Sequence, residues 1–190
     1  MTFQDEDSAL IAAALNGSSY AWDKLVRRYE RRIYNYGLRL TGNATDAMDL
    51  MQEVFLGVYR NLHRFRGDAQ FSSWLFRIAH NKAIDLARRK SLLAGHLDID
   101  DEEAVHMPPA ASQYEPDTQV SRFQANRDIV LMLQQLPMEQ RMIVELKIYQ
   151  SQTFDEIARL LDISENTAKT RFYTALRKLK SAMESSHVLS

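Results

Sequence analysis

The apolar side chains of Asp46–Lys90 recur every three to four residues, and this spacing limits what the stretch can fold into. Its first half reads DAMDLMQEVFLGVYRNLHRF. Apolar residues at such steps share one side of an α-helix, so we predict that this stripe is buried. The stripe consists of Met48, Met51, Phe55, Val58, Leu62 and Phe65. The opposite face, with Asp49, Gln52, Glu53 and Asn61, is expected to stay in solvent and to be available to a partner.

The second half of the stretch is strongly basic. Between Arg60 and Lys90 there are eight Lys or Arg residues against Asp68 and Asp85, a net charge of +6 in a chain whose formal net charge is −1. Four aromatic residues are interleaved with these cations: Phe65, Phe71, Trp74 and Phe76. Cations follow a phosphate backbone and aromatic rings stack on unpaired bases, so this pattern predicts a surface for single-stranded nucleic acid.

The segment DLMQEVFLGVYRNLHRFRGDAQFSSWLFRIAHNKAIDLARR resembles region 2 of bacterial sigma factors of the extracytoplasmic-function (ECF) type. The resemblance implies that the DLMQEVF helix docks on core RNA polymerase. The polymerase-binding residues it implies are Asp49, Leu50, Gln52 and Glu53, with Leu50 as an exposed apolar anchor.

The same resemblance implies that FRGDAQFSSWLFRIAHN captures the melted minus-10 promoter element. The implied single-strand residues are Arg64, Arg66, Gly67, Asp68, Phe71, Ser73, Trp74, Arg77, Asn81, Lys82 and Arg88. Trp74 is expected to meet a base at the edge of the melted region, and the Arg66–Ser73 loop to close on an extruded base. Asn81 carries a donor and an acceptor for a base edge. Phe71 fits a place in the core equally well, because aromatic residues at helical spacing are usually buried.

Composition restricts the class of protein. The chain has no cysteine, which excludes disulfides and thiolate zinc sites. No apolar run approaches the ~20 residues of a membrane span, and the start MTFQDEDSAL is unlike a secretory signal. The histidines show no metal-ligand spacing, and no residue group is suited to activate a nucleophile. We therefore expect a cytoplasmic protein without membrane insertion, cofactor, metal or enzymatic activity.

The middle of the chain differs from both ends. Residues 91–121 hold seven acidic residues, three prolines and no Lys or Arg. Unpaired like charges and prolines oppose helix formation, so we predict a flexible acidic linker. The residues favour a solvated tether. The alternative, which the family resemblance implies, is that the segment lies in a polymerase channel where nucleic acid would otherwise go.

Helical periodicity returns after residue 121 and ends in a short helix, a turn and a basic helix. Thr153 and Glu156 form a capping-box sequence, and Ser164 is the expected cap of the last helix. TFDEIARLLDISENTAKTRFYTALRKLK is typical of a helix-turn-helix and resembles region 4 of the same sigma family, which reads the minus-35 element. The residues implied for minus-35 DNA are Ser164, Thr167, Lys169, Thr170, Arg171, Tyr173, Thr174 and Arg177.

Asn16–Gly17 is predicted to end a short first helix, and Thr41–Asn43 to break the chain before the Asp46 helix. Together these features predict an all-α chain with two helical domains. Residues 1–90 would form sigma region 2, residues 91–121 the linker and residues 122–190 sigma region 4. The implied function is that of an alternative sigma factor, with core RNA polymerase, promoter DNA and an anti-sigma factor as partners. Two alternatives stay open: a dimeric helix-turn-helix regulator, which would bind a palindromic duplex without polymerase, and a protein-interaction module without promoter preference.

Overall fold

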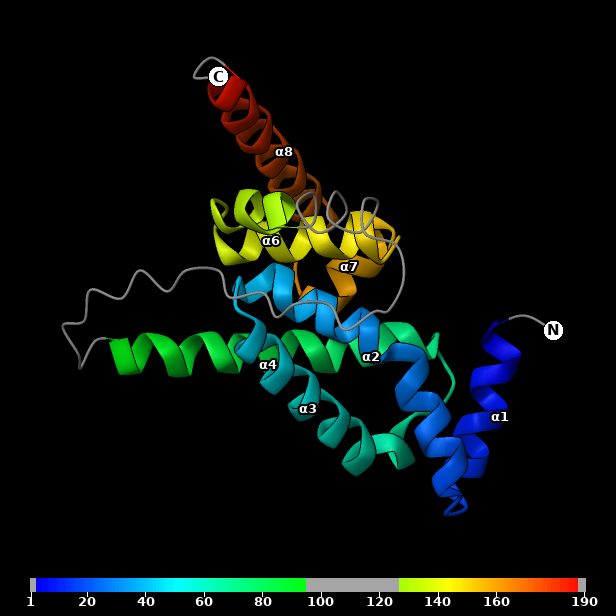
Figure 1. The fold of residues 1–190 in the computed structure, drawn as a ribbon. Helices are drawn as coiled ribbons and strands as arrows, with labels where there is room; N and C mark the ends of the chain where they lie inside the picture. The colour runs from blue at the N-terminus through cyan, green and yellow to red at the C-terminus, as the bar shows by residue number, and fades with distance from the viewer. Residues whose placement is uncertain (1–2, 95–126, 188–190) are drawn as a thin grey trace, which may run out of the picture. The chain divides into compact units, whose positions relative to one another are not determined.

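The computed structural model describes residues 3–94 and 127–187, and every regular element in these two stretches is helical (Figure 1). The predicted all-α fold class is confirmed. The elements are α1 (Phe3–Leu15), α2 (Ser19–Thr41), α3 (Ala44–Asn61), the 3-10 turn η1 (Leu62–Arg64), α4 (Phe71–Ala94), a helical stretch over 127–134, α6 (Met138–Val144), the π-helical segment η2 (Glu145–Tyr149), α7 (Phe154–Leu161) and α8 (Glu165–His187).

The chain divides into two compact units. Unit 1 contains Met1–Asn35 and Met48–Asp100, and unit 2 contains Tyr36–Ala47 and Asp101–Ser190. The corner between α2 and α3, Tyr36–Ala47, therefore groups with the C-terminal helices, whereas the predicted boundaries at 90 and 122 assign it to the first domain. Helix α4 continues to Ala94, so the first residues of the predicted linker are helical. The rest of that linker lies outside the described residues.

Helix ends in the first half follow from turn chemistry. Gly17, with φ of +87°, ends α1 directly after the Asn16 that the sequence marks as a stop. Ser18 accepts a hydrogen bond from the Ala21 N–H at 3.2 Å and caps α2. Gly42, with φ of +73°, ends α2, and the Asn43 side chain accepts from the Thr45 and Asp46 N–H groups at the start of α3. The expected break at Thr41–Asn43 is confirmed.

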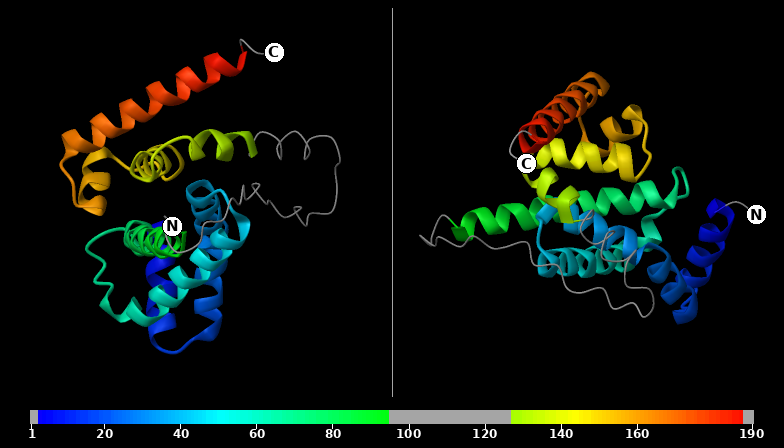
Figure 2. Two further views of the ribbon diagram at one scale, coloured as in Figure 1. Left: turned by 90° about the vertical axis from the view of Figure 1, so that its left-hand side faces the viewer. Right: turned by 45° about the horizontal axis from the view of Figure 1, so that its top comes forward.

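A buried carboxylate fixes α1 on α2. Asp7 is 6% exposed; its side chain accepts from the Tyr29 hydroxyl at 2.5 Å and from the Arg28 guanidinium at 2.7 Å. Both bonds satisfy a charge that would be costly to bury alone. Burial and the hydrogen bond to Asp7 raise the pKa of the Tyr29 hydroxyl. Helix α1 accordingly lies against the first half of α2 (Figures 1 and 2).

The buried side of α3 is rotated from the predicted stripe. The fully buried residues are Ala47, Leu50, Val54, Val58 and Leu62, whereas Met48 is 42% exposed. The prediction that all six residues of the stripe are buried is therefore wrong for Met48. Met51, Phe55 and Phe65 are only half-buried. The end of α2 lies very close to the start of α3 at Gly37 and Ala47, because a Cβ added at Gly37 would lie 3.0 Å from the Ala47 Cα. Both positions therefore require small residues.

A buried ion pair forms the centre of unit 2. The Arg39 guanidinium donates to both oxygens of Glu145, at 2.5 and 2.8 Å, and the Glu145 side chain is fully buried. The guanidinium carbon also lies 3.9 Å from the centroid of the Tyr149 ring, and Gln150 donates to Glu145 at 3.0 Å. This bidentate pair attaches the α2–α3 corner to η2 within the unit.

Arg141 adds a second attachment of the corner. Its guanidinium donates to the carbonyl oxygens of Leu133, Gln134 and Leu136, at and just after the end of the helical stretch 127–134. It also donates to the carbonyl oxygen of Leu40 in the corner. Burial lowers the pKa of the Arg141 guanidinium to about 10.

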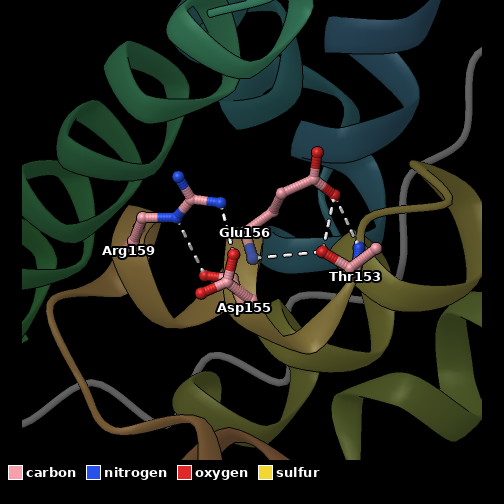
Figure 3. A network of polar contacts seen from close by, with 4 residues as sticks. All are labelled: Thr153, Asp155, Glu156 and Arg159. Atoms are coloured by element: carbon pink, nitrogen blue, oxygen red, sulfur yellow. Dashed lines mark hydrogen bonds and ion pairs between the residues drawn. The ribbon is translucent and has the colours of Figure 1, made fainter.

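The predicted caps of the last two helices are confirmed. Thr153 accepts from the Glu156 N–H at 3.2 Å, and the Glu156 carboxylate accepts from the Thr153 N–H at 2.7 Å (Figure 3). Arg159 pairs with Asp155 on the same helix (Figure 3). Ser164 accepts from the Thr167 N–H at 3.0 Å and starts α8. Helix α7 ends at Asp162, whose φ of 54° is left-handed, and α8 follows after a tight turn (Figure 2).

No helix in the described residues is both long and apolar enough to cross a membrane.

Candidate functional site

The outward face of α3 is polar with apolar patches. Asp49 and Gln52 are exposed, and Glu53 is half-buried. Leu50 is only 2% exposed, so its prediction as an exposed apolar anchor is wrong: it faces the core, one position away from the outward face.

Other apolar residues take the place that was expected for Leu50. Met48, Leu56 and Tyr59 are 42%, 48% and 67% exposed, and they lie three or four positions from Gln52 or from one another. The Tyr59 ring packs edge-on against Trp22 at 5.2 Å between centroids. The pattern of α3 did not indicate these residues, because the predicted buried stripe included Met48. Helical spacing counted from Gln52 leads to Met48 and Leu56, and from Leu56 to Tyr59. The candidate docking face therefore combines two exposed polar groups with an exposed apolar row.

Glu53 connects α3 to α4. Its carboxylate lies 2.9 Å from the Lys82 ammonium, with 44% of the Glu53 and 31% of the Lys82 side chain exposed. The hydrogen bond and the charge of Lys82 lower the pKa of the Glu53 carboxyl, and Arg89 and Arg60 contribute less. One turn further along α3, a Cβ on Gly57 would lie 3.1 Å from the Ile78 Cγ2 and 3.7 Å from the Lys82 Cε. The absence of a side chain at Gly57 thus lets α3 lie close to Ile78 of α4, and the stem of Lys82 passes at ordinary contact distance.

An aromatic cluster joins η1 to the start of α4. The rings of Phe65, Phe71 and Trp74 have mutual centroid distances of 5.5 to 5.7 Å, and Tyr29 contacts Phe71 edge-on at 5.5 Å. Phe71 is 4% exposed, so the prediction that it binds DNA directly is wrong for this conformation and its alternative place in the core is correct. Trp74 and Phe65 are half-buried and keep an accessible surface. The cluster thus has a buried base and an accessible edge.

The polar residues implied for single-strand binding extend from the η1–α4 loop along α4. Arg64, Arg66, Gly67, Asp68, Arg77, Asn81 and Arg88 are exposed, and Ser73 and Lys82 are half-buried. Gly67 has a φ of +76°, which places it in the left-handed region that favours glycine. Arg32, which was not among the predicted residues, lies 5.4 Å from the centroid of Phe76 and 5.6 Å from that of Tyr29. The surface remains rich in cations, with one indole as its candidate stacking group.

His80 lies beneath this surface and introduces pH dependence. It is 8% exposed, and its Nδ1 has no hydrogen-bond partner among the described residues. Burial lowers the pKa of its imidazole from 6.5 to about 4. The unfolded chain therefore takes up this proton first, so stability falls as the pH drops from 6.5 towards 4.

We expect His80 to account for about 2 kcal/mol of the stability lost between pH 8 and pH 5. His80→Leu cannot titrate and should reduce the pH dependence by that amount. The measurement is the free energy of unfolding in urea at both pH values. An unchanged pH dependence in the variant would exclude His80 as its source.

The face of α8 that was predicted to read DNA is only partly free. Thr170, Tyr173 and Arg177 are exposed, whereas Lys169 and Thr174 are half-buried. The Lys169 ammonium pairs with Glu165 at 2.7 Å and lies 6.0 Å from the Phe154 ring centroid. Thr170, Tyr173 and Arg177 are therefore the side chains best placed to reach a major groove.

The remaining predicted residues of α8 have internal partners. Arg171 pairs with Glu139 at 2.8 Å, and Arg177 donates to the Thr174 hydroxyl at 3.3 Å. The hydroxyls of Ser164 and Thr167 lie 2.7 Å apart at the start of the helix. Ile157, Ala158, Ala168, Phe172 and Ala175 are buried and belong to the core of α7 and α8.

Comparison with known proteins finds two sigma-factor regions in the chain. The family model described as Sigma-70 region 2 matches residues 25–92, and the one described as Sigma-70, region 4 matches residues 126–179. The ECF RNA polymerase sigma factor SigM of Mycobacterium tuberculosis is 32% identical over 91% of this chain and 82% of its own. The RNA polymerase sigma-H factor of Pseudomonas aeruginosa is 28% identical over 97% of both chains.

Solved structures show the same fold. The structure of CnrH in complex with the cytosolic domain of CnrY covers 95% of this chain and 99% of its own, with a TM-score of 0.69 at 23% identity. RpoE from Bartonella quintana, in complex with the anti-sigma factor NepR, covers 85% and 96%, with a TM-score of 0.70 at 18% identity. At these identities the likeness concerns the fold alone.

Proposed function

Because the chain belongs to the ECF group of RNA polymerase sigma factors, it is an alternative sigma factor that directs polymerase to promoters, and we propose that three of its surfaces divide this work. The outward face of α3 docks on core polymerase. The basic aromatic surface of α4 holds the melted minus-10 strand. The exposed face of α8 reads the minus-35 duplex. The observation that carries this proposal is the presence, in one chain, of a cationic aromatic surface and a capped helix-turn-helix.

The docking role of α3 rests on its chemistry. Asp49, Gln52 and Glu53 offer carboxylate and amide oxygens to a basic partner, and Met48, Leu56 and Tyr59 offer exposed apolar area beside them. Interfaces commonly combine a few apolar anchors with surrounding polar groups. We include the three apolar residues in the docking face and leave Leu50 to the core.

The role of α4 rests on Trp74 and the cations around it. Phosphate contacts would fix the position of the strand, and an indole face would stack on an unpaired base. Because these contacts exist only with a melted strand, their binding free energy favours the open state. On α8, Arg177 and Tyr173 are proposed to reach base edges, and Arg171 is proposed to exchange Glu139 for a phosphate.

We also propose where the chain acts and which protein holds it inactive. The chain is proposed to work in the cytoplasm, as an initiation factor without chemistry of its own. An anti-sigma factor, like the partner of the Bartonella quintana RpoE, is proposed to cover its exposed faces when the chain is inactive.

The test is co-elution with core RNA polymerase on a sizing column. The full-length chain is expected to travel with polymerase, and Gln52→Ala/Glu53→Ala to bind about tenfold or more weakly, since it loses a charged hydrogen-bonding group. Glu30→Ala, which removes an exposed acid from α2 instead, should bind like the wild type.

The outcomes separate the alternatives. If all three proteins travel with polymerase, the assignment of the docking face is wrong. If none does, polymerase binding itself is wrong and a regulator that binds palindromic duplex becomes the leading explanation.

A further inference from the structure

The two candidate surfaces of unit 1 meet at one ion pair. Glu53 belongs to the face proposed to dock on polymerase, and Lys82 belongs to the surface proposed to bind the single strand. Their charged atoms lie 2.9 Å apart, so in the free chain each neutralises the other.

Both groups are within reach of outside partners. The Glu53 and Lys82 side chains are 44% and 31% exposed, so a basic group can approach Glu53 while a phosphate approaches Lys82. The stem of Lys82 lies beside Gly57, which leaves the ammonium beside α3. The Lys82 ammonium has three hydrogen-bond donors but a single positive charge. As long as Glu53 is ionised and binds no other basic group, its carboxylate neutralises part of this charge and weakens the attraction of Lys82 for a phosphate.

We propose that Glu53 acts as an internal competitor of the nucleic-acid backbone: it holds Lys82 in the free chain and releases it when a basic group of polymerase binds Glu53. The inference rests on the proposed function and adds its regulation. Because binding linkage is reciprocal, a phosphate on Lys82 would strengthen docking through Glu53 by the same factor.

The expected size of the effect follows from the exposure of the pair. Exposed ion pairs change affinities modestly, so a freed Lys82 is expected to tighten single-strand binding about threefold. One additional phosphate contact on a single strand steepens the dependence of log K on log[salt] by about 0.7. A change in this slope identifies a new phosphate contact, which a merely structural effect of the substitution would not produce.

The experiment measures binding of the full-length free chain to a fluorescein-labelled 20-nucleotide oligo(dT) over a salt series. Glu53→Gln is expected to bind about threefold tighter than the wild type, with the steeper slope. The matched control is Asp49→Asn, which removes one exposed acid from the same helix without touching Lys82 and should give a smaller gain and an unchanged slope. In a Lys82→Gln background, Glu53→Gln should give no more than the small gain of Asp49→Asn and should leave the slope unchanged.

Each outcome decides between the proposals. Equal gains for Glu53→Gln and Asp49→Asn, or a full threefold gain from Glu53→Gln in the Lys82→Gln background, would overturn the inference and leave the proposed function standing. If no variant binds the oligonucleotide even at low salt, the single-strand surface itself is wrong and the inference falls with it. Co-elution with polymerase tests the docking face separately.

Discussion

Replacing Arg39 by methionine is expected to lower the free energy of unfolding by about 3–5 kcal/mol. The substitution keeps a long apolar stem and removes the only cation that pairs with the fully buried Glu145 within the described part of the chain. Gln150 still donates one hydrogen bond to Glu145, but an amide does not compensate a buried charge. Urea denaturation followed by far-ultraviolet circular dichroism measures the loss.

The double variant separates the cost of an orphaned charge from the net value of the pair. Arg39→Met/Glu145→Met removes both charges, and buried ion pairs replaced by apolar residues are often neutral or even stabilised. We therefore expect it to recover most of the stability lost by Arg39→Met alone.

An exposed pair on the same helix provides the control. Arg27 pairs with Asp23 at 2.8 Å, with 73% of the Arg27 side chain exposed. Arg27→Met should cost only about 0.3–0.5 kcal/mol. If Arg39→Met costs as little as Arg27→Met, the attachment of the α2–α3 corner to η2 contributes nothing to folding, contrary to its assignment to unit 2.

The sequence predicts local structure well because helix ends depend on nearby residues. The stop at Asn16–Gly17, the break at Thr41–Asn43, the capping box at Thr153–Glu156 and the Ser164 cap each involve residues no more than four positions apart. Backbone geometry and hydrogen bonding decide such features almost independently of the rest of the chain.

The rotation of α3 could not be settled in the same way. Apolar residues at steps of three and four trace two neighbouring stripes on this helix, and both include Val58 and Leu62. The stripe with Met48 contains the larger side chains, but the structure buries Ala47, Leu50 and Val54. The close approach of Gly37 to Ala47 requires a small residue at position 47, which favours this rotation of the helix. The choice depends on a neighbouring helix, so the sequence of α3 alone left Leu50 and Met48 on the wrong sides.

Ion pairs between residues far apart in the chain cannot be predicted from a local sequence pattern. Arg39 and Glu145 are separated by 106 positions, and nothing in either local sequence distinguishes them from exposed residues. The Glu53–Lys82 pair, 29 positions apart, was hidden for another reason: both residues were predicted for binding, but to different partners. Family resemblance predicts binding roles for both residues, and only the structure reveals that the two pair with one another.

Trp74→Ala is expected to weaken promoter opening roughly tenfold to a hundredfold, because a base stacked on an aromatic side chain gains about 1–3 kcal/mol. Duplex binding should change little, since the exposed face of α8 does not involve this residue. The measurement compares permanganate reactivity of the melted strand with closed-complex affinity, using holoenzyme and a promoter selected by the wild-type holoenzyme from randomised DNA. Trp74→Phe, which keeps an aromatic face, should retain most of the activity.

The second tryptophan provides a control for the loss of an indole. Trp22 is also half-buried, but it packs against Tyr59 and lies outside the cluster of Phe65, Phe71 and Trp74. At saturating polymerase, Trp22→Ala should therefore leave opening near the wild-type level. Equal losses of opening and duplex binding in Trp74→Ala would mean that the substitution disturbs the fold around buried Phe71, and the stacking role of Trp74 would then be wrong. A loss confined to opening means that the indole meets the DNA only after the strands separate.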